Sequence, residues 1–244
     1  MNAASTLEVS GLVKRFGKKA VVRGVTFAMH EGEVVGFLGP NGAGKTTVFY
    51  MIVGFIHPTE GQILLDGRNI TEEAMYRRAR SGISYLPQEP SVFRKLTVEQ
   101  NIMAILETRP DLDRVSRQER LEELLVELGI AENRRQKAYT LSGGERRRTE
   151  IARSLAIQPK FLLLDEPFAG IDPIAVYEIK TIVQSLAARG IGVLITDHNV
   201  RDTLEITHRS YIIKDGEIVV AGTREEVMGN AIARKVYLGE RFQM

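Results

Sequence analysis

The stretch GPNGAGKTT, residues 39–47, decides the fold of this 244-residue chain. It matches the pattern G-x-x-x-x-G-K-[ST], follows the apolar segment EVVGFL and precedes the apolar segment VFYMIVG. The order strand, glycine-rich turn, helix is therefore predicted here. Glycines let the backbone turn tightly, so that successive N–H groups can point at the oxygens of a phosphate.

The residue types in this loop predict a nucleotide-binding site. Lys45 supplies a positive charge for the β- and γ-phosphates, and the Thr46 hydroxyl can ligate Mg²⁺. The following helix directs its positive N-terminal end at the same anion. We expect bound nucleotide to lie against the whole loop, which consists of Gly39, Pro40, Asn41, Gly42, Ala43, Gly44, Lys45, Thr46 and Thr47.

A second segment, FLLLDE, is an apolar strand that ends in two adjacent carboxylates. Neighbouring strand residues face opposite ways, so the two acids can have separate tasks. Asp165 is predicted to hold Mg²⁺ through water, and Glu166 is the candidate general base that polarises the attacking water. The loop and this strand together indicate a nucleotide triphosphatase.

The remaining sequence predicts an α/β protein. Residues 7–17 and 20–29 alternate as strands do, and Asp66-Gly67 and Asp215-Gly216 lie between apolar runs as hairpin turns do. Residues 71–80 and most of 97–157 have helical patterns, whereas GISYLP, FLLLD and IGVLITDH are strand-like. Buried strands that alternate with helices favour a parallel or mixed core sheet, with an antiparallel β element and a helical insertion.

One predicted helix carries a leucine stripe expected to face the core. Ser116 and Glu119 have the spacing of a capping box, and the helix is expected to end near Gly129. The stripe consists of Leu121, Leu124, Leu125 and Leu128.

Composition excludes several classes of function. The 33 basic and 31 acidic residues give a net charge of +2, too small to attract nucleic acid or anionic lipid. The chain has no cysteine, so disulfides, thiolate metal sites and cysteine nucleophiles are excluded. The N-terminus does not have the pattern of a signal peptide, and apolar runs are too short to span a bilayer. If the protein acts at a membrane, a partner is expected to supply the membrane-spanning part.

The segment LSGGE, followed by RRRTEIARSLA, distinguishes among triphosphatases. It is a second serine–glycine turn at a predicted helix N-terminus, between the first loop and the acidic strand. With these motifs the chain resembles the ABC ATPase family. The resemblance implies that Leu141, Ser142, Gly143, Gly144 and Glu145 contact the γ-phosphate held by a second copy. Glu145 replaces the more common glutamine and leaves the serine–glycine turn intact.

The same resemblance assigns further roles. Gln88, in YLPQE, would sense the metal and the attacking water, and His198, in ITDH, would contact the γ-phosphate. Asp172, in AGID, would lie in the loop that crosses the dimer interface. Phe16 occupies the position of the aromatic residue that stacks on adenine, where the family more often has tyrosine.

The resemblance covers essentially the whole chain, as one ABC nucleotide-binding domain over residues 1–244. Its core would comprise about 1–88 and 160–244, and its helical subdomain about 89–159. The segment YLPQEPSVFRKLTVEQNI and the tail VYLGERF are similar to the ATPase subunits of bacterial lipopolysaccharide exporters. This implies an ATP- and Mg²⁺-dependent homodimer beneath two membrane permease subunits, at the cytoplasmic face of the inner membrane.

In such a complex, residues 90–96 would line the groove that receives a coupling helix of a permease subunit. Phe93 and Arg94 are the candidate contacts, although Phe93 could equally pack in the core. The basic residues 146–148 are predicted to form a solvated helix face, without a role in binding nucleic acid.

Three other functions are compatible with parts of the sequence. The ATPase of a branched-chain amino acid importer has a similar length and similar motifs, but ERRR and the VYLGE tail favour lipopolysaccharide export. Soluble ABC ATPases that act on DNA or ribosomes usually have two cassettes, coiled coils or zinc-binding insertions. They are disfavoured because this chain has one cassette and no cysteine. A nucleotide-binding regulator without turnover is disfavoured because both Glu166 and His198 are present.

Overall fold

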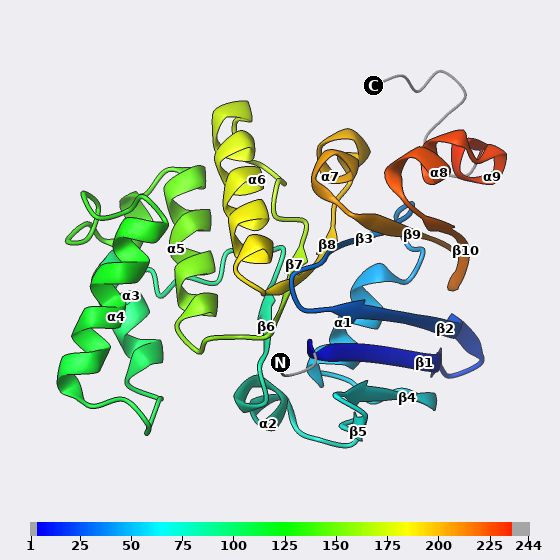
Figure 1. Cartoon of the computed structure of the whole chain (residues 1–244), viewed down its shortest axis with the longest axis horizontal. Helices are drawn as coiled ribbons and strands as arrows, with labels where there is room; N and C mark the ends of the chain where they lie inside the picture. The colour runs from blue at the N-terminus through cyan, green and yellow to red at the C-terminus, as the bar shows by residue number, and fades with distance from the viewer. Residues whose placement is uncertain (1–3, 236–244) are drawn as a thin grey trace.

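The computed structural model describes residues 4–235 of the chain. Its strands form two sheets, and its helices cover the larger sheet and extend to one side of it (Figure 1). The tail VYLGERF, which contributed to the resemblance to lipopolysaccharide exporters, begins at residue 236 and lies outside the described residues. No helix in residues 4–235 is both long enough and apolar enough to cross a membrane.

The larger sheet, counted over the described residues, has six strands in the order β10-β9-β3-β8-β7-β6. β3 pairs in parallel with β8 and β9, β7 pairs in parallel with β6 and β8, and β10 is antiparallel to β9. Every residue of β3, β7 and β8 is buried, as expected for a sheet covered on both faces. The strands are β3 (Val34–Leu38), β6 (Ile83–Leu86), β7 (Phe161–Asp165), β8 (Gly192–Thr196), β9 (Arg209–Lys214) and β10 (Glu217–Gly222).

The smaller sheet is antiparallel, with the order β2-β1-β4-β5 among the described residues. Its strands are β1 (Thr6–Phe16), β2 (Lys19–His30), β4 (Glu60–Leu65) and β5 (Arg68–Asn69). Asp66 and Gly67 connect β4 to β5, both with positive φ, which is the backbone shape of a tight hairpin turn. Both predicted hairpins are confirmed, because Asp215 and Gly216 have the same shape between β9 and β10.

Helix α1 (Lys45–Val53) lies between the two sheets (Figure 1). Phe49 and Ile52 are fully buried in a core that includes Leu7 of β1, Met29 of β2 and Phe37 of β3. The glycine-rich loop before α1 is therefore held between a strand and a helix that cannot move independently of the core.

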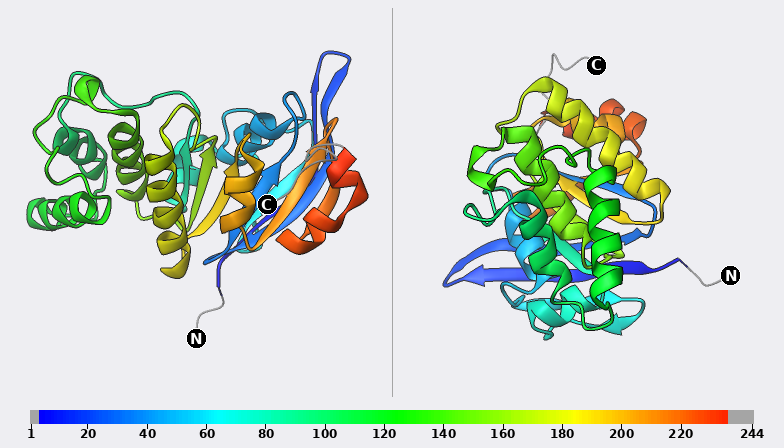
Figure 2. Two further views of the ribbon diagram at one scale, coloured as in Figure 1. Left: turned by 90° about the horizontal axis from the view of Figure 1, so that it is seen from above. Right: turned by 90° about the vertical axis from the view of Figure 1, so that its left-hand side faces the viewer.

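A group of helices occupies the other end of the molecule, away from the antiparallel sheet (Figure 2). The predicted leucine stripe on α4 is confirmed, since Leu121, Leu124, Leu125 and Leu128 are at most 2% exposed. Over the whole of the described residues, the helical elements besides α1 are α2 (Met75–Arg80), α3 (Val98–Leu106), α4 (Arg114–Glu127), η1 (Ala138–Thr140), α5 (Gly143–Leu155), α6 (Pro173–Ala188), α7 (Val200–Ile206), α8 (Arg224–Gly229) and α9 (Ala231–Ala233). The division into a core and a helical subdomain at residues 89–159 stays a prediction.

Two helix starts differ from the sequence-based expectation. Asp113, rather than Ser116, caps α4, because its carboxylate accepts a hydrogen bond from the Ser116 N–H at 2.8 Å. The helix expected over residues 71–80 begins only at Met75. The Thr71 hydroxyl instead accepts from the Ile63 N–H, which ties the preceding segment to β4.

The prediction that residues 146–148 form a solvated face is wrong. Arg147 is 6% exposed and donates to the carbonyl oxygens of Pro87 and Asp165, at 2.8 and 3.1 Å. It also forms an ion pair with Glu150, which is likewise buried. Helix α5 is thereby fastened to the segments that follow β6 and end β7.

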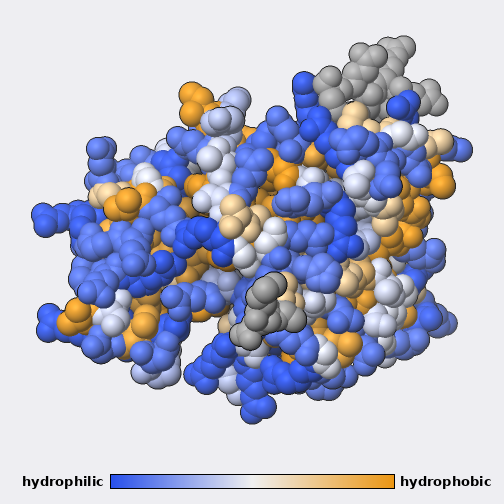
Figure 3. Space-filling view, viewed as in Figure 1, coloured by the Kyte–Doolittle hydropathy of each residue, from blue (hydrophilic) through white to orange (hydrophobic). Residues whose placement is uncertain are grey.

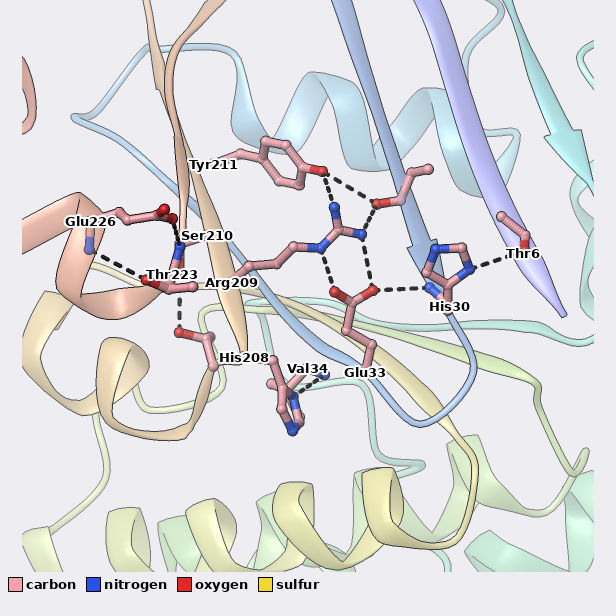
Figure 4. A network of polar contacts seen from close by, with 12 residues as sticks. Thr6, His30, Glu33, Val34, His208, Arg209, Ser210, Tyr211, Thr223 and Glu226 are labelled. Carbon is pink, nitrogen blue, oxygen red and sulfur yellow. Dashed lines mark hydrogen bonds and ion pairs between the residues drawn. The ribbon is translucent and has the colours of Figure 1, made fainter. Parts of the chain in front are cut away.

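A polar network fixes the start of β3 (Figure 4). The Arg209 guanidinium pairs with Glu33 and donates to the Ala28 carbonyl at 2.6 Å. The Val34 N–H donates to His208 Nδ1 at 2.9 Å. These contacts join β2 and β9 to the start of β3. They therefore hold the strand that leads into the glycine-rich loop at its beginning.

Candidate active site

The site lies where the carboxyl ends of the parallel strands meet, a common position for ligand sites in open α/β sheets. β3 leads into the glycine-rich loop at Gly39, and β6 leads to Gln88. β7 ends at Asp165 and Glu166, and β8 is followed by His198. The sheet thus brings together candidates that are far apart in the sequence.

The loop conformation requires glycine at two positions. A Cβ at Gly39 would lie 2.1 Å from the carbonyl oxygen of Ile213, so a larger residue would displace the β9 backbone. Gly44 has φ of 107° and ends the loop as the N-cap of α1. No side chain caps α1 at this end, so the N–H groups of its first turn remain available for an anion.

Lys45 lies under the loop and is 6% exposed. Its Nζ donates to the carbonyl oxygens of Gly39 and Pro40, at 2.7 and 3.2 Å. Burial lowers the pKa of Lys45, and the charges of Glu166 and Asp165 oppose that effect. The carbonyl oxygens and the nearby carboxylates thus offset part of the cost of burying the ammonium.

An open hollow of about 380 Å³ lies over the loop. Its walls come from five segments: β2, the loop with α1, and the residues after β6, β7 and β8. The lining residues are Val21, Asn41, Gly42, Ala43, Gly44, Lys45, Thr46, Thr47, Gln88, Glu166 and His198.

Glu166 contacts both of the other predicted catalytic residues, Gln88 and His198. Gln88 Nε2 donates to Glu166 Oε2 at 2.6 Å, and His198 Nε2 lies 2.6 Å from Oε1. Glu166 has φ of 48°, unusual for a residue other than glycine and held by a hydrogen bond from its N–H to the Thr196 carbonyl. Burial raises the pKa of Glu166, with the His198 charge acting in the opposite direction.

Asp165 lies behind Glu166 and is 2% exposed. The Thr196 hydroxyl donates to its Oδ1 at 2.7 Å, and the Tyr85 hydroxyl lies 3.2 Å from its Oδ2. No group of three His, Cys, Asp or Glu side chains in residues 4–235 could hold a metal by itself. One carboxylate with the Thr46 hydroxyl nevertheless fits Mg²⁺, which usually binds few protein oxygens together with substrate phosphates.

The serine–glycine turn begins α5, and Ser142 is its N-cap. The Ser142 hydroxyl accepts from the Glu145 N–H at 3.3 Å, and the Glu145 carboxylate accepts from the Ser142 N–H at 2.8 Å. Asn133 Nδ2 also donates to Glu145, at 2.9 Å. Hydrogen bonds from Ser142 lower the pKa of Glu145. The replacement of glutamine by Glu145 therefore keeps a complete capping box.

The structure does not bring this turn into the hollow of its own chain, because residues 141–145 are absent from the hollow's lining. The turn lies instead beside the predicted interface loop, where a Cβ at Gly143 would come within 3.3 Å of Ile171. Asp172 caps α6 by accepting from the N–H groups of Ile174 and Ala175, both at 3.0 Å.

Phe16 and Phe93, the two aromatic residues assigned peripheral roles, are both exposed, and the stacking role of Phe16 stays a prediction. Phe16 is 53% exposed, with Lys14 Nζ 5.3 Å from its ring centroid, but it does not line the hollow. Phe93 is 44% exposed, so the alternative of core packing is wrong. Its ring lies under the Arg153 guanidinium at 4.3 Å, and Arg94 beside it is exposed.

Sequence reasoning missed three residues at or behind the site. Val21 lines the hollow, Tyr85 contacts Asp165, and Arg147 bonds to the carbonyls of Pro87 and Asp165. Tyr85 precedes Gln88 by only three residues, which was the one available signal. Val21 and Arg147 reach the site through folding, and no local pattern marks them.

A phosphate-binding loop, a strand ending in two acids and a polar cluster on Glu166 define a P-loop nucleotide triphosphatase. Residues 22–169 match the family described as ABC transporter. The chain is 56% identical to the lipopolysaccharide export system ATP-binding protein LptB of Acidithiobacillus ferridurans, over 98% of each chain. It is 52% identical to the protein of the same name in Haemophilus influenzae, over 98% of this chain and 100% of that one.

Solved structures of ABC transporter cassettes share the fold of this chain. A nucleotide-free ATP-binding cassette from an ABC transporter matches with a TM-score of 0.86, at 29% identity over 97% of this chain and 100% of that one. The ADP conformation of another such cassette matches with a TM-score of 0.84, at 29% identity over 98% and 100%. The chain belongs to the ABC transporter ATP-binding family. It is an ATP-hydrolysing subunit, and the predicted fold class is confirmed.

Proposed function

We propose that this chain powers the export of lipopolysaccharide by hydrolysing ATP at the hollow over residues 39–47. One observation carries the catalytic part: Gln88 and His198 both contact Glu166 within the hollow that contains Lys45. The substrate of transport is inferred from the full-length similarity to relatives named for lipopolysaccharide export.

In this proposal Glu166 accepts a proton from the attacking water. His198 and Gln88 hold the carboxylate in place, and His198 is exposed enough to reach a γ-phosphate in the hollow. Lys45 and the first-turn N–H groups of α1 bind the β- and γ-phosphates. Phe16, whose ring is exposed, would supply the surface on which adenine stacks.

Thr46 and Asp165 would hold Mg²⁺ together with the phosphates. Gln88 would turn from Glu166 to the ion when the attacking water takes its place on Glu166. The ion would neutralise the charge that develops on the transferred phosphoryl group. Asp165 would bind through water, because its own oxygens already accept from Thr196 and Tyr85.

A second copy would complete each site. Ser142 and its glycines lie outside their own chain's hollow but at an exposed helix N-terminus, which is suited to a phosphate on another molecule. Gly170 and Asp172, both exposed beside this turn, would then lie at the dimer interface. The dimer is expected to be head-to-tail and to enclose two nucleotides.

The homodimer would act beneath two membrane permease subunits, at the cytoplasmic face of the bacterial inner membrane. Exposed Phe93, next to Arg94, supports a docking position for a permease helix, since exposed aromatic and arginine side chains are frequent interface anchors. Membrane contact would occur through these partners.

The test is complementation in a Gram-negative host depleted of its own lipopolysaccharide-export ATPase. We expect this chain to restore growth and to co-purify with the permease subunits of that system. Glu166→Gln is the control, expected to co-purify without restoring growth. Co-purification with amino acid importer permeases instead would reject lipopolysaccharide export and revive that alternative, which the names of the relatives do not favour.

A further inference from the structure

Tyr85, at the end of β6, contacts the active site and the outer surface at the same time. Its hydroxyl lies 3.2 Å from Asp165 Oδ2. Its ring meets the rings of Tyr50 and Phe55 edge-on, at centroid distances of 6.2 and 5.8 Å, and that of Phe49 at 6.4 Å. A single side chain thus joins the predicted metal ligand to an aromatic cluster.

That aromatic cluster forms one wall of an apolar groove of about 440 Å³. Tyr85, Tyr50, Phe55 and Met75 all line the groove, and Phe55 is 51% exposed. The groove lies between α2 and the helical end, since Met75 and Ala79 line it from one side and Ile105 and Arg153 from the other. In Figure 3 a notch at the lower edge separates the helical end from the rest of this face. The ring of Tyr85 is therefore positioned by side chains that reach solvent.

The hydroxyl of Tyr85 donates a hydrogen bond to Asp165. The phenol lies 3.2 Å from a carboxylate oxygen, which can only accept, so Tyr85 is the donor in this contact. Asp165 is almost fully buried, and its other oxygen accepts from the Thr196 hydroxyl. Two hydroxyls from different strands therefore set the direction of this carboxylate, and partners of a metal ligand control the geometry in which it binds metal.

We propose that Tyr85 is a positioning residue for Asp165, and that the packing of Phe55 in the groove controls this positioning. A shift of Phe55 moves the Tyr85 ring, and the hydroxyl moves with it relative to Asp165. The inference rests on the proposed role of Asp165 as metal ligand and is independent of what the transporter exports.

Metal binding, rather than turnover, tests the hydroxyl. The full-length protein is saturated with the non-hydrolysable ATP analogue AMP-PNP and titrated with Mn²⁺, which is followed by electron paramagnetic resonance. Tyr85→Phe should raise the Mn²⁺ dissociation constant about tenfold, the lower range for losing such a partner, with metal-free nucleotide affinity within about twofold. An unchanged Mn²⁺ constant, or an equal loss of metal-free nucleotide binding, would overturn the positioning role.

A double-mutant cycle tests the role of the groove. Phe55→Ala should weaken Mn²⁺ binding by about three- to tenfold on its own, and should have no further effect in the Tyr85→Phe background. Tyr76→Ala, on an exposed residue outside this cluster, is the matched control and should leave Mn²⁺ binding unchanged. Additive effects of Phe55→Ala and Tyr85→Phe would reject transmission through the hydroxyl.

The Phe55→Ala variant alone keeps the test decisive if Tyr85→Phe does not fold, because normal Mn²⁺ affinity in that variant contradicts the proposal. If the wild-type chain fails to restore growth but the variants weaken Mn²⁺ binding as expected, lipopolysaccharide export is rejected and this inference stands.

Discussion

At the residue scale, Glu166, the proposed general base, is held in one orientation. Gln88 and His198 contact its two oxygens, and its backbone is held at a positive φ by Thr196. A side chain fixed at both oxygens has few orientations to lose when water and nucleotide arrive. Such pre-organisation is what a general base requires.

Glu166→Gln should slow ATP turnover by about 10²–10⁴, the range for losing a general base, because the amide cannot accept the proton. The shape of the residue is kept, so nucleotide affinity should change little. Single-turnover hydrolysis and nucleotide binding measure the two effects separately. A normal rate in this variant would show that another group takes the proton.

The pH dependence of hydrolysis should reflect the burial of Glu166, which raises its pKa. A raised pKa means that the carboxyl holds its proton at pH values where an ordinary glutamate is ionised. We therefore expect kcat to fall on acidification with a midpoint above the ordinary value of about 4.3, and to recover as pH rises. The residual rate of Glu166→Gln is the control and should lack this limb. A midpoint at or below the ordinary value would contradict the prediction.

At the scale of elements, α1 depends on a residue from another helix. Arg78 of α2 is fully buried and donates to the carbonyl oxygens of Met51 and Ile52 at the end of α1, at 2.6 and 2.8 Å. It also donates to the carbonyls of Thr71 and Glu73, at 2.6 and 2.8 Å. A single guanidinium thus satisfies carbonyls that the end of a helix leaves without partners.

Arg78→Met should lower the free energy of unfolding by about 3 kcal/mol, because several buried carbonyls lose their donor. Denaturant titration measures this change. The neighbouring substitution Arg77→Met is the matched control, and since Arg77 is exposed it should leave the free energy of unfolding close to that of the wild type. Equal stabilities of the two variants would mean that water replaces the guanidinium.

At the scale of the whole molecule, the two predicted phosphate-binding turns do not meet within one chain. Lys45 lines the hollow, whereas Ser142 does not. Gly143, the residue after Ser142, faces Gln88 and the interface loop in a separate small hollow. A symmetric pair of chains would bring each turn to the other chain's loop, and a two-fold arrangement makes two equivalent sites.

Mixing two inactive variants tests this arrangement. Lys45→Ala and Ser142→Ala should each be nearly inactive alone, but a mixed dimer has one complete site. An equal mixture should recover at most about a quarter of the wild-type rate, since half the dimers are mixed and each has one of two sites intact. Ser142→Ala should still bind ATP as a monomer. Absence of recovery, with dimers demonstrably exchanged, would place Ser142 in its own chain's site.

The sequence by itself determined the fold class and most of the candidate site. Residues 39–47, the FLLLDE strand and the two Asp-Gly turns act through local backbone geometry, and each was found where predicted. The start of α4 was misplaced because aspartate and serine both cap helices well, and the structure shows that Asp113 is the residue that does so.

Only the tertiary structure decided the rest. It brought Gln88 and His198 to opposite oxygens of Glu166, buried Arg147, and placed Tyr85 between Asp165 and the groove. Such contacts join residues separated by tens of positions, and their energies depend on burial and on partners that local patterns do not encode. A short motif specifies its own backbone, whereas the environment of a side chain is a property of the packed molecule.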